Sequence, residues 1–301
     1  MLQCPSCGRR FRESRCPTHG TPVSLSSLGT HPEPTPPHFP GYRVTRVLGQ
    51  GGFGTVYAAE GPDGPCAIKT SHRNLAVADA RLHREADALA AVGPPYVPRL
   101  HAQGSLADGT FYVVMDLIGW PTLAELLCDR PPWSASEVLP VARGVLRALV
   151  AAHAADRVHR DLKPENIFVG EGEVKLVDFG LVKVLGSADE QLTLAGSIIG
   201  SPAYMSPEQS AGKTDLDARS DIYSFGVILY ELLAGRPPFL GPVADVTHAH
   251  LGRRPPRLAS LVPVSPALDE LVHACLAKSQ SDRPASAAAL LPRLEDRKSV
   301  V

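Results

Sequence analysis

The sequence predicts an α+β fold in which a small part rich in strands precedes a larger helical part. Apolar, β-branched and aromatic runs at 42–48, 66–70 and 111–119 are typical of buried strands. After residue 120, apolar positions repeat at helical spacing, most clearly at 134–155 and 221–234. Because the strands come ahead of most of the helices, we expect one sheet-containing part and one helical part.

Composition limits the classes of protein to consider. The chain has 301 residues, of which 44% are hydrophobic and 20% charged, and its net charge is −1. This length accommodates one domain of about 260 residues and a small appendage. The near-neutral charge argues against a protein that binds nucleic acid or membrane surfaces. We see neither an apolar run of about 18 residues nor a signal peptide, so we expect a soluble, cytoplasmic protein.

Residues 1–28 predict a small zinc-binding module. The turn Cys-Pro-Ser-Cys-Gly is answered by Cys-Pro-Thr-His-Gly, and this pairing resembles the knuckles of small zinc ribbons. A closed site of four ligands would bind structural Zn²⁺, and a reducible tail without metal is the alternative. Residues 29–41 are rich in proline and predict an extended linker, with a docking motif as the alternative. The expected zinc ligands are Cys4, Cys7, Cys16 and His19.

A glycine-rich turn joins the first two predicted strands. It reads Gly-Gln-Gly-Gly-Phe-Gly from Gly49 to Gly54, and a second strand continues through Glu60. Because glycine has no side chain, backbone N–H groups in such a turn can approach phosphate oxygens. A dinucleotide-binding fold requires a helix after this motif, whereas a strand follows here.

A third strand at 66–70 carries Lys69, and a helix is predicted from Ala78 to Val92. The helix places the apolar residues Leu82, Ala86 and Leu89 on one face. We expect Glu85, sixteen residues after Lys69, to be the partner of that lysine, with Asp87, on another face of the helix, as the alternative.

Two acidic clusters lie close together near the middle of the chain. The first is His-Arg-Asp-Leu-Lys-Pro-Glu-Asn at 159–166, and the second is Asp-Phe-Gly at 178–180. Short strands at 167–169 and 174–177 flank a glycine turn, so the chain reverses and three oxygen donors can face one space. These donors are Asp161, Asn166 and Asp178. Oxygen ligands of this kind suit Mg²⁺. The stretch predicts phosphoryl transfer, and a polar surface loop is the alternative.

In this order, the motifs resemble the catalytic set of protein kinases. The resemblance covers residues 42–297 and implies a two-lobed fold, with an N-lobe at 42–117 and a C-lobe at 120–297. It implies transfer of the γ-phosphoryl group of ATP to protein serine or threonine hydroxyls. Serine/threonine kinases carry lysine at the position of Lys163, where tyrosine kinases differ.

The resemblance also implies roles for individual residues. Asp161 would accept the hydroxyl proton, Lys163 would stabilise the transferring group, and Lys69 would hold the α- and β-phosphates. Asn166 and Asp178 would hold Mg²⁺ or Mn²⁺. The implied ATP-binding residues are Gly49, Gln50, Gly51, Gly52, Phe53, Gly54, Val56, Ala67, Lys69, Glu85, Met115, Asp116, Ile118 and Phe168.

The first long helix of the helical part has two candidate starts. Ser134 forms a capping-box pattern with Glu137, but Pro140 favours a later start at Ser136, which keeps the proline in the first turn. His153, near the end of this helix, is expected to pack in the core. The predicted inward stripe of the helix is Val138, Val141, Val145, Leu149 and Ala152.

Four more residues are expected to have structural roles. Glu208 should pair with Arg283, which lies far along the chain. Asp221 opens a segment that is apolar nearly all round, which is typical of a buried helix. Gly235 should end that helix.

Arg160 precedes the predicted base, and in protein kinases such an arginine indicates activation by loop phosphorylation. The loop at 186–200 offers Ser197 first and Thr193 second as autophosphorylation sites, with a merely solvated loop as the alternative. A catalytically weak kinase-fold scaffold, or an adaptor that acts through the zinc module, remains an alternative function. Expected partners are ATP, proteins with serine or threonine, and a partner of the zinc module.

Overall fold

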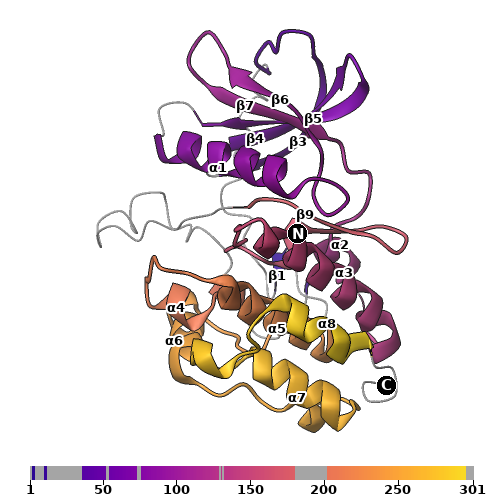
Figure 1. The fold of residues 1–301 in the computed structure, drawn as a ribbon, viewed down its shortest axis with the longest axis vertical. Helices are drawn as coiled ribbons and strands as arrows, with labels where there is room; N and C mark the ends of the chain where they lie inside the picture. Colours follow the sequence, from indigo (N-terminus) through magenta and orange to yellow (C-terminus); the bar gives the residue numbers. More distant parts are fainter. Residues whose placement is uncertain are drawn as a thin grey trace. The chain divides into compact units, whose positions relative to one another are not determined.

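The computed structural model describes residues 2–3, 10–11, 36–51, 54–72, 76–128, 130, 132–179 and 202–295. Predictions for Cys4, Cys7, Cys16, His19, Gly52, Phe53, Thr193 and Ser197 lie outside the described residues. The described chain divides into two compact units (Figure 1). The sheet unit holds the described residues from 36 to Trp120. The helical unit holds residues 2–3 and 10–11 together with the described residues from Pro121 onward.

The sheet unit is built on one antiparallel sheet with the strand order β3-β4-β5-β7-β6. Strands are present at all four positions predicted for this unit. The edge strand β6 was not predicted, because its sequence Leu-His-Ala-Gln-Gly-Ser lacks a β-branched run. The strands are β3 (Arg43–Gly51), β4 (Gly54–Gly61), β5 (Gly64–Ser71), β6 (Leu100–Ser105) and β7 (Phe111–Asp116), and the helix is α1 (Ala76–Val92).

Strand register sorts the side chains of this sheet onto two faces. Val56 lies opposite Lys69, which lies opposite Val113, and Ala67 lies opposite Met115. Side chains of paired residues share a face, and so do those two positions apart, which places these residues together. The predicted nucleotide-binding residues Val56, Ala67, Lys69 and Met115 therefore occupy one face.

The opposite face is covered by a residue from outside the strands. Phe39 is 1% exposed and packs in a cluster with Tyr57, Ile68 and Val114. Phe39 falls within the stretch 29–41 that was predicted as a linker. That prediction is wrong for Phe39, because its aromatic ring fills the sheet's second face.

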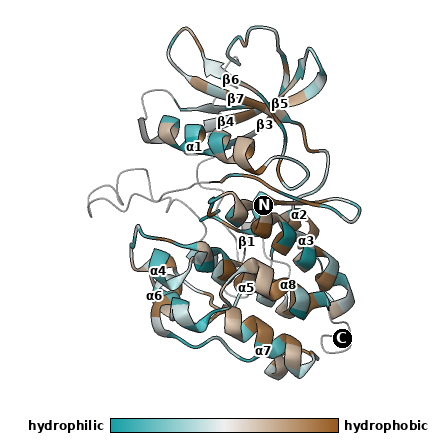
Figure 2. Ribbon diagram, in the orientation of Figure 1, coloured by the Kyte–Doolittle hydropathy of each residue, from teal (hydrophilic) through white to brown (hydrophobic). Residues whose placement is uncertain are grey.

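The helical unit surrounds one buried helix, α5 (Ala218–Ala234), which is apolar along most of its length (Figure 2). Gly235 ends it with a positive φ of 70°, and the predicted end is confirmed. The other helices are α2 (Leu123–Leu126), α3 (Ala135–Ala154), α4 (Pro207–Ser210), α6 (Val243–Gly252), α7 (Pro266–Cys275) and α8 (Ala287–Glu295). Two hairpins, β1 (Leu2–Gln3) with β2 (Arg10–Phe11) and β8 (Ile167–Val169) with β9 (Val174–Leu176), complete the unit.

The start of α3 differs from the favoured prediction. The helix begins at Ala135, with Ser134 as its N-cap, and Pro140 lies inside it. Glu137 accepts hydrogen bonds from the Ser134 backbone N–H at 2.9 Å and from its hydroxyl at 2.7 Å. This capping interaction stabilises the earlier start although Pro140 gives up one helical hydrogen bond. The predicted inward stripe of α3 is confirmed, because all five of its residues are buried.

No helix in the part of the chain that the structure describes has both the length and the apolar character needed to cross a membrane.

Candidate active site

Lys69 and Glu85 form an ion pair in the sheet unit. The Lys69 Nζ atom lies 2.5 Å from Glu85 Oε2, and only 7% of the Glu85 side chain is exposed. Lys69 comes from β5 and Glu85 from α1, so the pair ties the helix to the sheet face that carries Val56, Ala67 and Met115. A lysine held in this way has a fixed ammonium group, which suits it to bind phosphate oxygens.

The glycine-rich segment is the turn of the β3–β4 hairpin. Gly51 pairs with Gly54, and Gly49 and Gln50 pair with residues of β4. A Cβ atom on Gly54 would lie 1.8 Å from the Thr70 carbonyl oxygen on β5. Glycine is therefore required at position 54 for sheet packing. Sequence reasoning had assigned it only to the approach of phosphate.

The strand β7 leads into the connection that carries the predicted ATP-binding residues Asp116 and Ile118. Met115 is buried, and the backbone N–H of Asp116 donates to Arg99 O at 3.0 Å. The Asp116 carboxylate accepts from the Arg99 N–H and contacts His101. A nucleotide could therefore use only the carbonyl oxygen of Asp116. Ile118 follows the strand in irregular backbone.

In the helical unit, the structure brings together the three polar residues of the loop at 159–166. Lys163 Nζ donates to Asp161 Oδ2 at 2.7 Å. The Asn166 side-chain amide donates to Asp161 O at 2.9 Å and to Asp161 Oδ2 at 3.3 Å. Burial alone would lower the pKa of Lys163, but Asp161 and the nearby carboxylates raise it, so the ammonium stays charged. Asp161 is thus held in one orientation by two donors.

The hairpin β8–β9 positions Asp178 beside this loop. The Val177 N–H donates to Asn166 O at 3.1 Å, and the Val177 carbonyl lies 2.9 Å from His159 Nε2. Asp178 itself has a φ of 63°, a left-handed conformation that is uncommon for a non-glycine residue. Phe179 is 2% exposed and packs against His159, with ring centroids 4.5 Å apart. The backbone bonds of Val177 before Asp178 and the packed ring of Phe179 after it therefore hold Asp178 in this conformation.

His159 is an uncharged histidine that is hydrogen-bonded both to the loop at 159–166 and to the residue after strand β9. Burial lowers its pKa, which favours the uncharged imidazole. Its Nδ1 accepts from the Asp161 N–H at 3.4 Å, so Nε2 carries the proton and donates to Val177 O. The histidine thus links Asp161 to the residue that precedes Asp178.

Asp221 fixes the backbone of the loop at 159–166. Its two carboxylate oxygens accept from the His159 and Arg160 N–H groups, each at 2.8 Å, and it also contacts His153 Nε2 at 2.8 Å. Arg160 has a φ of 67°, and its carbonyl accepts from the Gln209 side chain. The prediction that His153 merely packs in the core overlooked its bond to Asp221. These contacts join residues far apart in sequence, so spacing along the chain gave no signal for them.

Glu208 and Arg283 form the ion pair expected between them. Two parallel bonds of 2.7 and 2.8 Å join the groups, and both side chains are buried. Arg283 also donates to three backbone carbonyls, those of Ala277, Arg219 and Lys278. The guanidinium is therefore fully hydrogen-bonded, which a buried charge requires.

The donor set of the helical unit is compatible with Mg²⁺. Both hydrogen bonds of the Asn166 amide use its nitrogen, which leaves the amide oxygen to face a cation. Among the described residues, no group of three or more His, Cys, Asp or Glu side chains forms a metal site. One carboxylate and one amide oxygen suffice where phosphate oxygens complete the shell, which is how Mg²⁺ is usually bound.

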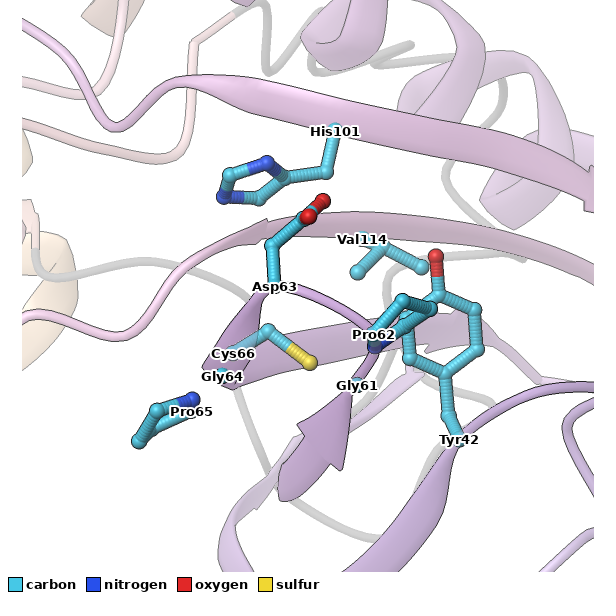
Figure 3. A pocket seen from close by; sticks show the side chains of 9 residues that line it. All are labelled: Tyr42, Gly61, Pro62, Asp63, Gly64, Pro65, Cys66, His101 and Val114. Carbon is cyan, nitrogen blue, oxygen red and sulfur yellow. The ribbon is translucent and has the colours of Figure 1, made fainter.

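A separate hollow opens in the sheet unit around the β4–β5 turn (Figure 3). Figure 3 shows Tyr42 beside Gly61, and a Cβ atom on Gly61 would lie 2.7 Å from the Tyr42 ring. None of the predicted catalytic or nucleotide-binding residues lines this hollow.

The chain is similar in sequence to known protein kinases. A sequence profile described as the protein kinase domain matches residues 42–292. The chain is 40% identical over 263 residues to serine/threonine-protein kinase PknL of Mycobacterium tuberculosis, which covers 84% of this chain and 65% of that protein. It is 37% identical over 270 residues to serine/threonine-protein kinase pkn3 of Myxococcus xanthus, covering 84% and 49%. The chain therefore spans about half to two thirds of the length of these relatives.

Among solved structures, the kinase domain of PknI from Mycobacterium tuberculosis is similar, with a TM-score of 0.67 and 26% identity. The match covers 87% of this chain and 97% of that one. It therefore extends over both the sheet unit and the helical unit.

Proposed function

Because this chain belongs to the protein kinase family, we propose that it transfers the γ-phosphoryl group of ATP to serine or threonine hydroxyls of proteins. The sheet unit is then the N-lobe of the kinase fold, and the helical unit is its C-lobe. One observation carries the proposal. Asp161 is oriented by Lys163 and Asn166 on a loop whose backbone is bonded to Asp221.

Each of the predicted site residues has its own role in this reaction. Asp161 accepts the proton of the substrate hydroxyl, and the Lys163 ammonium stabilises negative charge on the transferring group. Lys69, held by Glu85, binds the α- and β-phosphates. The oxygens of Asn166 and Asp178 would hold Mg²⁺, which would supply neutralisation of phosphate charge. Catalysis then depends on positioning and charge, with no covalent intermediate on the protein.

The choice of serine or threonine as the acceptor follows from two observations. Both curated relatives compared above are named serine/threonine-protein kinases. Lys163, two residues after Asp161, contacts the carboxylate directly, and this lysine is typical of that class.

Substitution of Asp161, Lys69 or Asp178 tests the activity. We expect Asp161→Asn, Lys69→Met and Asp178→Asn each to reduce transfer from labelled ATP to a general protein substrate by about 10²–10³-fold or more. Asp245→Asn, at an exposed carboxylate on α6, is the control and should keep full activity. Circular dichroism should show that all four variants remain folded. Wild-type protein without any transfer, or an Asp178→Asn variant with full transfer, would favour a kinase-fold scaffold instead.

We also propose that the enzyme is activated when it phosphorylates its own loop. Ser197 is the first candidate and Thr193 the second, and both lie outside the described residues. Arg160 supports the proposal, because no carboxylate pairs with its guanidinium in the described part of the chain and arginine binds phosphate in bidentate fashion. Mass spectrometry should find loop phosphate in wild-type protein and none in Asp161→Asn. A Thr193→Ala/Ser197→Ala protein with full activity on an added substrate would contradict the switch.

We propose in addition that Cys4, Cys7, Cys16 and His19 bind one structural Zn²⁺. The four ligands lie outside the described residues. In sequence, Cys4 and Cys7 fall between the paired strands β1 and β2. That pairing supports the proposal, because a hairpin is the usual setting for two ligands of a zinc knuckle.

A further inference from the structure

Gln209 joins helix α4 to the loop at 159–166 through the two ends of its side-chain amide. Its Oε1 atom accepts from the Ser206 backbone N–H at 3.0 Å, and its Nε2 atom donates to the Arg160 carbonyl oxygen at 2.5 Å. The Ser206 hydroxyl accepts from the Gln209 N–H at 3.3 Å, which completes a capping box at the start of α4. The bond to Arg160 is not part of this capping box, and it reaches 49 positions back along the chain.

Glutamine is a residue type that can make both contacts at once. A capping box needs a side-chain acceptor at this position, and glutamate supplies one as well as glutamine does. The bond to the Arg160 carbonyl needs a donor, which an ionised carboxylate lacks. With glutamate at position 209, α4 would keep its cap while a charged oxygen faced a carbonyl oxygen. Capping of α4 therefore accounts for only one end of the Gln209 amide.

The Arg160 carbonyl belongs to the peptide group that immediately precedes the Cα atom of Asp161. Because a peptide group is planar, the same plane carries the Asp161 N–H, which donates to His159 Nδ1 at 3.4 Å. Gln209 and His159 therefore hold the two sides of one plane, and the bond from Gln209 is the shorter of the two. Rotation of this plane would change the direction in which the Asp161 side chain leaves the backbone.

The backbone beside this plane adopts a conformation that needs such contacts. Arg160 has a φ of 67°, in the left-handed region that residues other than glycine seldom occupy. A conformation of this kind persists only where the surrounding structure holds it. Asp221 accepts from the Arg160 N–H at 2.8 Å, and Gln209 donates to the carbonyl oxygen of the same residue. Loss of the Gln209 donor would remove one of these two backbone contacts.

Helix α4 is itself anchored, so the Gln209 amide acts from a fixed base. Glu208, the residue before it, is 4% exposed and is joined to Arg283 by two bonds. Glu208 also accepts from the Ser220 hydroxyl at 2.6 Å. The buried ion pair therefore limits how far Gln209 can move away from the Arg160 carbonyl.

We infer that Gln209 is a positioning residue for the transfer step, which acts on Asp161 through the backbone carbonyl of Arg160. The inference rests on the proposed kinase function and adds to it a residue from outside the predicted catalytic set. To accept a proton, Asp161 must face the substrate hydroxyl in one orientation, and a misplacement of about 1 Å can lower the rate about 10²-fold. The proposed nucleotide ligand Lys69 is not part of this chain of contacts, so binding of ATP should not depend on it.

Two substitutions separate the contact with Arg160 from the capping of α4. Gln209→Glu keeps the acceptor for the Ser206 N–H and loses the donor, whereas Gln209→Lys keeps a donor and loses the acceptor. Gln103→Glu, at an exposed glutamine on β6, is the matched control. The rate constant of transfer is measured in single turnovers, with the full-length chain in excess over labelled ATP and a general protein substrate at saturation. This rate constant does not depend on the fraction of the enzyme that is folded.

Gln209→Glu should lower the rate constant about 10- to 100-fold and leave KM for ATP at the wild-type value. Gln209→Lys should transfer faster than Gln209→Glu, and Gln103→Glu should match wild type. A role confined to the capping of α4 predicts the opposite order, with Gln209→Glu unaffected and Gln209→Lys slower. The inference is overturned if Gln209→Glu keeps the wild-type rate constant, if Gln209→Lys is no faster than Gln209→Glu, or if Gln103→Glu reproduces the loss.

A further variant covers the case in which circular dichroism shows that Gln209→Glu does not fold. Gln209→Met then replaces it, since methionine is similar in size and lacks both contacts. It should transfer more slowly than Gln209→Lys, which lacks only the capping acceptor. Equal rate constants for these two variants would count against the inference.

Failure of the kinase proposal is recognised separately. If wild-type protein transfers no phosphate, hydrogen exchange followed by mass spectrometry still reports how tightly the loop at 159–166 is held. Faster exchange of its N–H groups in Gln209→Glu than in wild type or Gln103→Glu supports the positioning role. Equal exchange in all three proteins refutes it.

Discussion

Replacing Glu208 by glutamine should destabilise the helical unit by about 3 kcal/mol. Burial alone would raise the pKa of Glu208, but hydrogen bonds from Arg283 and Ser220 lower it from 4.5 to about 2. At about 1.4 kcal/mol per pH unit, this difference corresponds to about 3 kcal/mol in favour of the charged form. The figure agrees with the 3–5 kcal/mol typical of breaking one side of a buried ion pair.

Urea unfolding at pH 7, followed by the fluorescence of the buried Trp133 in the same unit, measures this loss. The control is Glu295→Gln, which breaks an exposed pair with Arg147 at 3.4 Å and should cost less than about 0.5 kcal/mol. Because the pKa of Glu208 is depressed in the folded protein, its contribution is complete above pH 4.5 and is lost as pH falls toward 2. A cost below about 1 kcal/mol for Glu208→Gln, or a cost equal to that of the control, would refute the reasoning.

Three further predictions concern other parts of the chain. Burial and the Lys278 ammonium lower the pKa of His250 to about 3, so the unfolded chain takes up a proton below pH 6.5 that the folded chain excludes. The free energy of unfolding should therefore fall by about 1.3 kcal/mol from pH 7 to pH 5.5 because of His250. Urea titrations at both pH values should show that the fall is smaller by this amount in the His250→Gln variant. Gly54→Ala should lower the melting temperature of the sheet unit, because its Cβ would overlap the Thr70 carbonyl, whereas Gly119→Ala, with open space around it, should not. Elemental analysis of protein purified without chelator should find one zinc per chain, and a protein without zinc would rule out the predicted ligand set.

Much of the fold was predictable because local patterns and global packing agree. The run around Lys69 reads as a strand, and the inward stripe of α3 is buried as its spacing predicts. The β8–β9 hairpin also appears where short β-branched runs flank a glycine turn. In each case the signal lies within a few neighbouring residues.

The features that were missed depend on residues distant in sequence or on competing local effects. Phe39 was assigned to a linker because prolines surround it, yet the sheet offers its ring an apolar face. Pro140 suggested a later helix start, and the capping interaction of Ser134 with Glu137 outweighs it. Nothing near Arg10 indicates that its partners lie more than 150 positions further along the chain.

Helix α5 joins two parts of the helical unit that lie far apart in sequence. Asp221, near its start, accepts from the backbone that precedes Asp161, and Glu231, near its end, accepts from Arg10 of strand β2. Ten residues separate the two carboxylates, which is about 15 Å of helix at 1.5 Å per residue. Because α5 is buried along its length, it holds the loop at 159–166 and strand β2 at a fixed spacing within the helical unit.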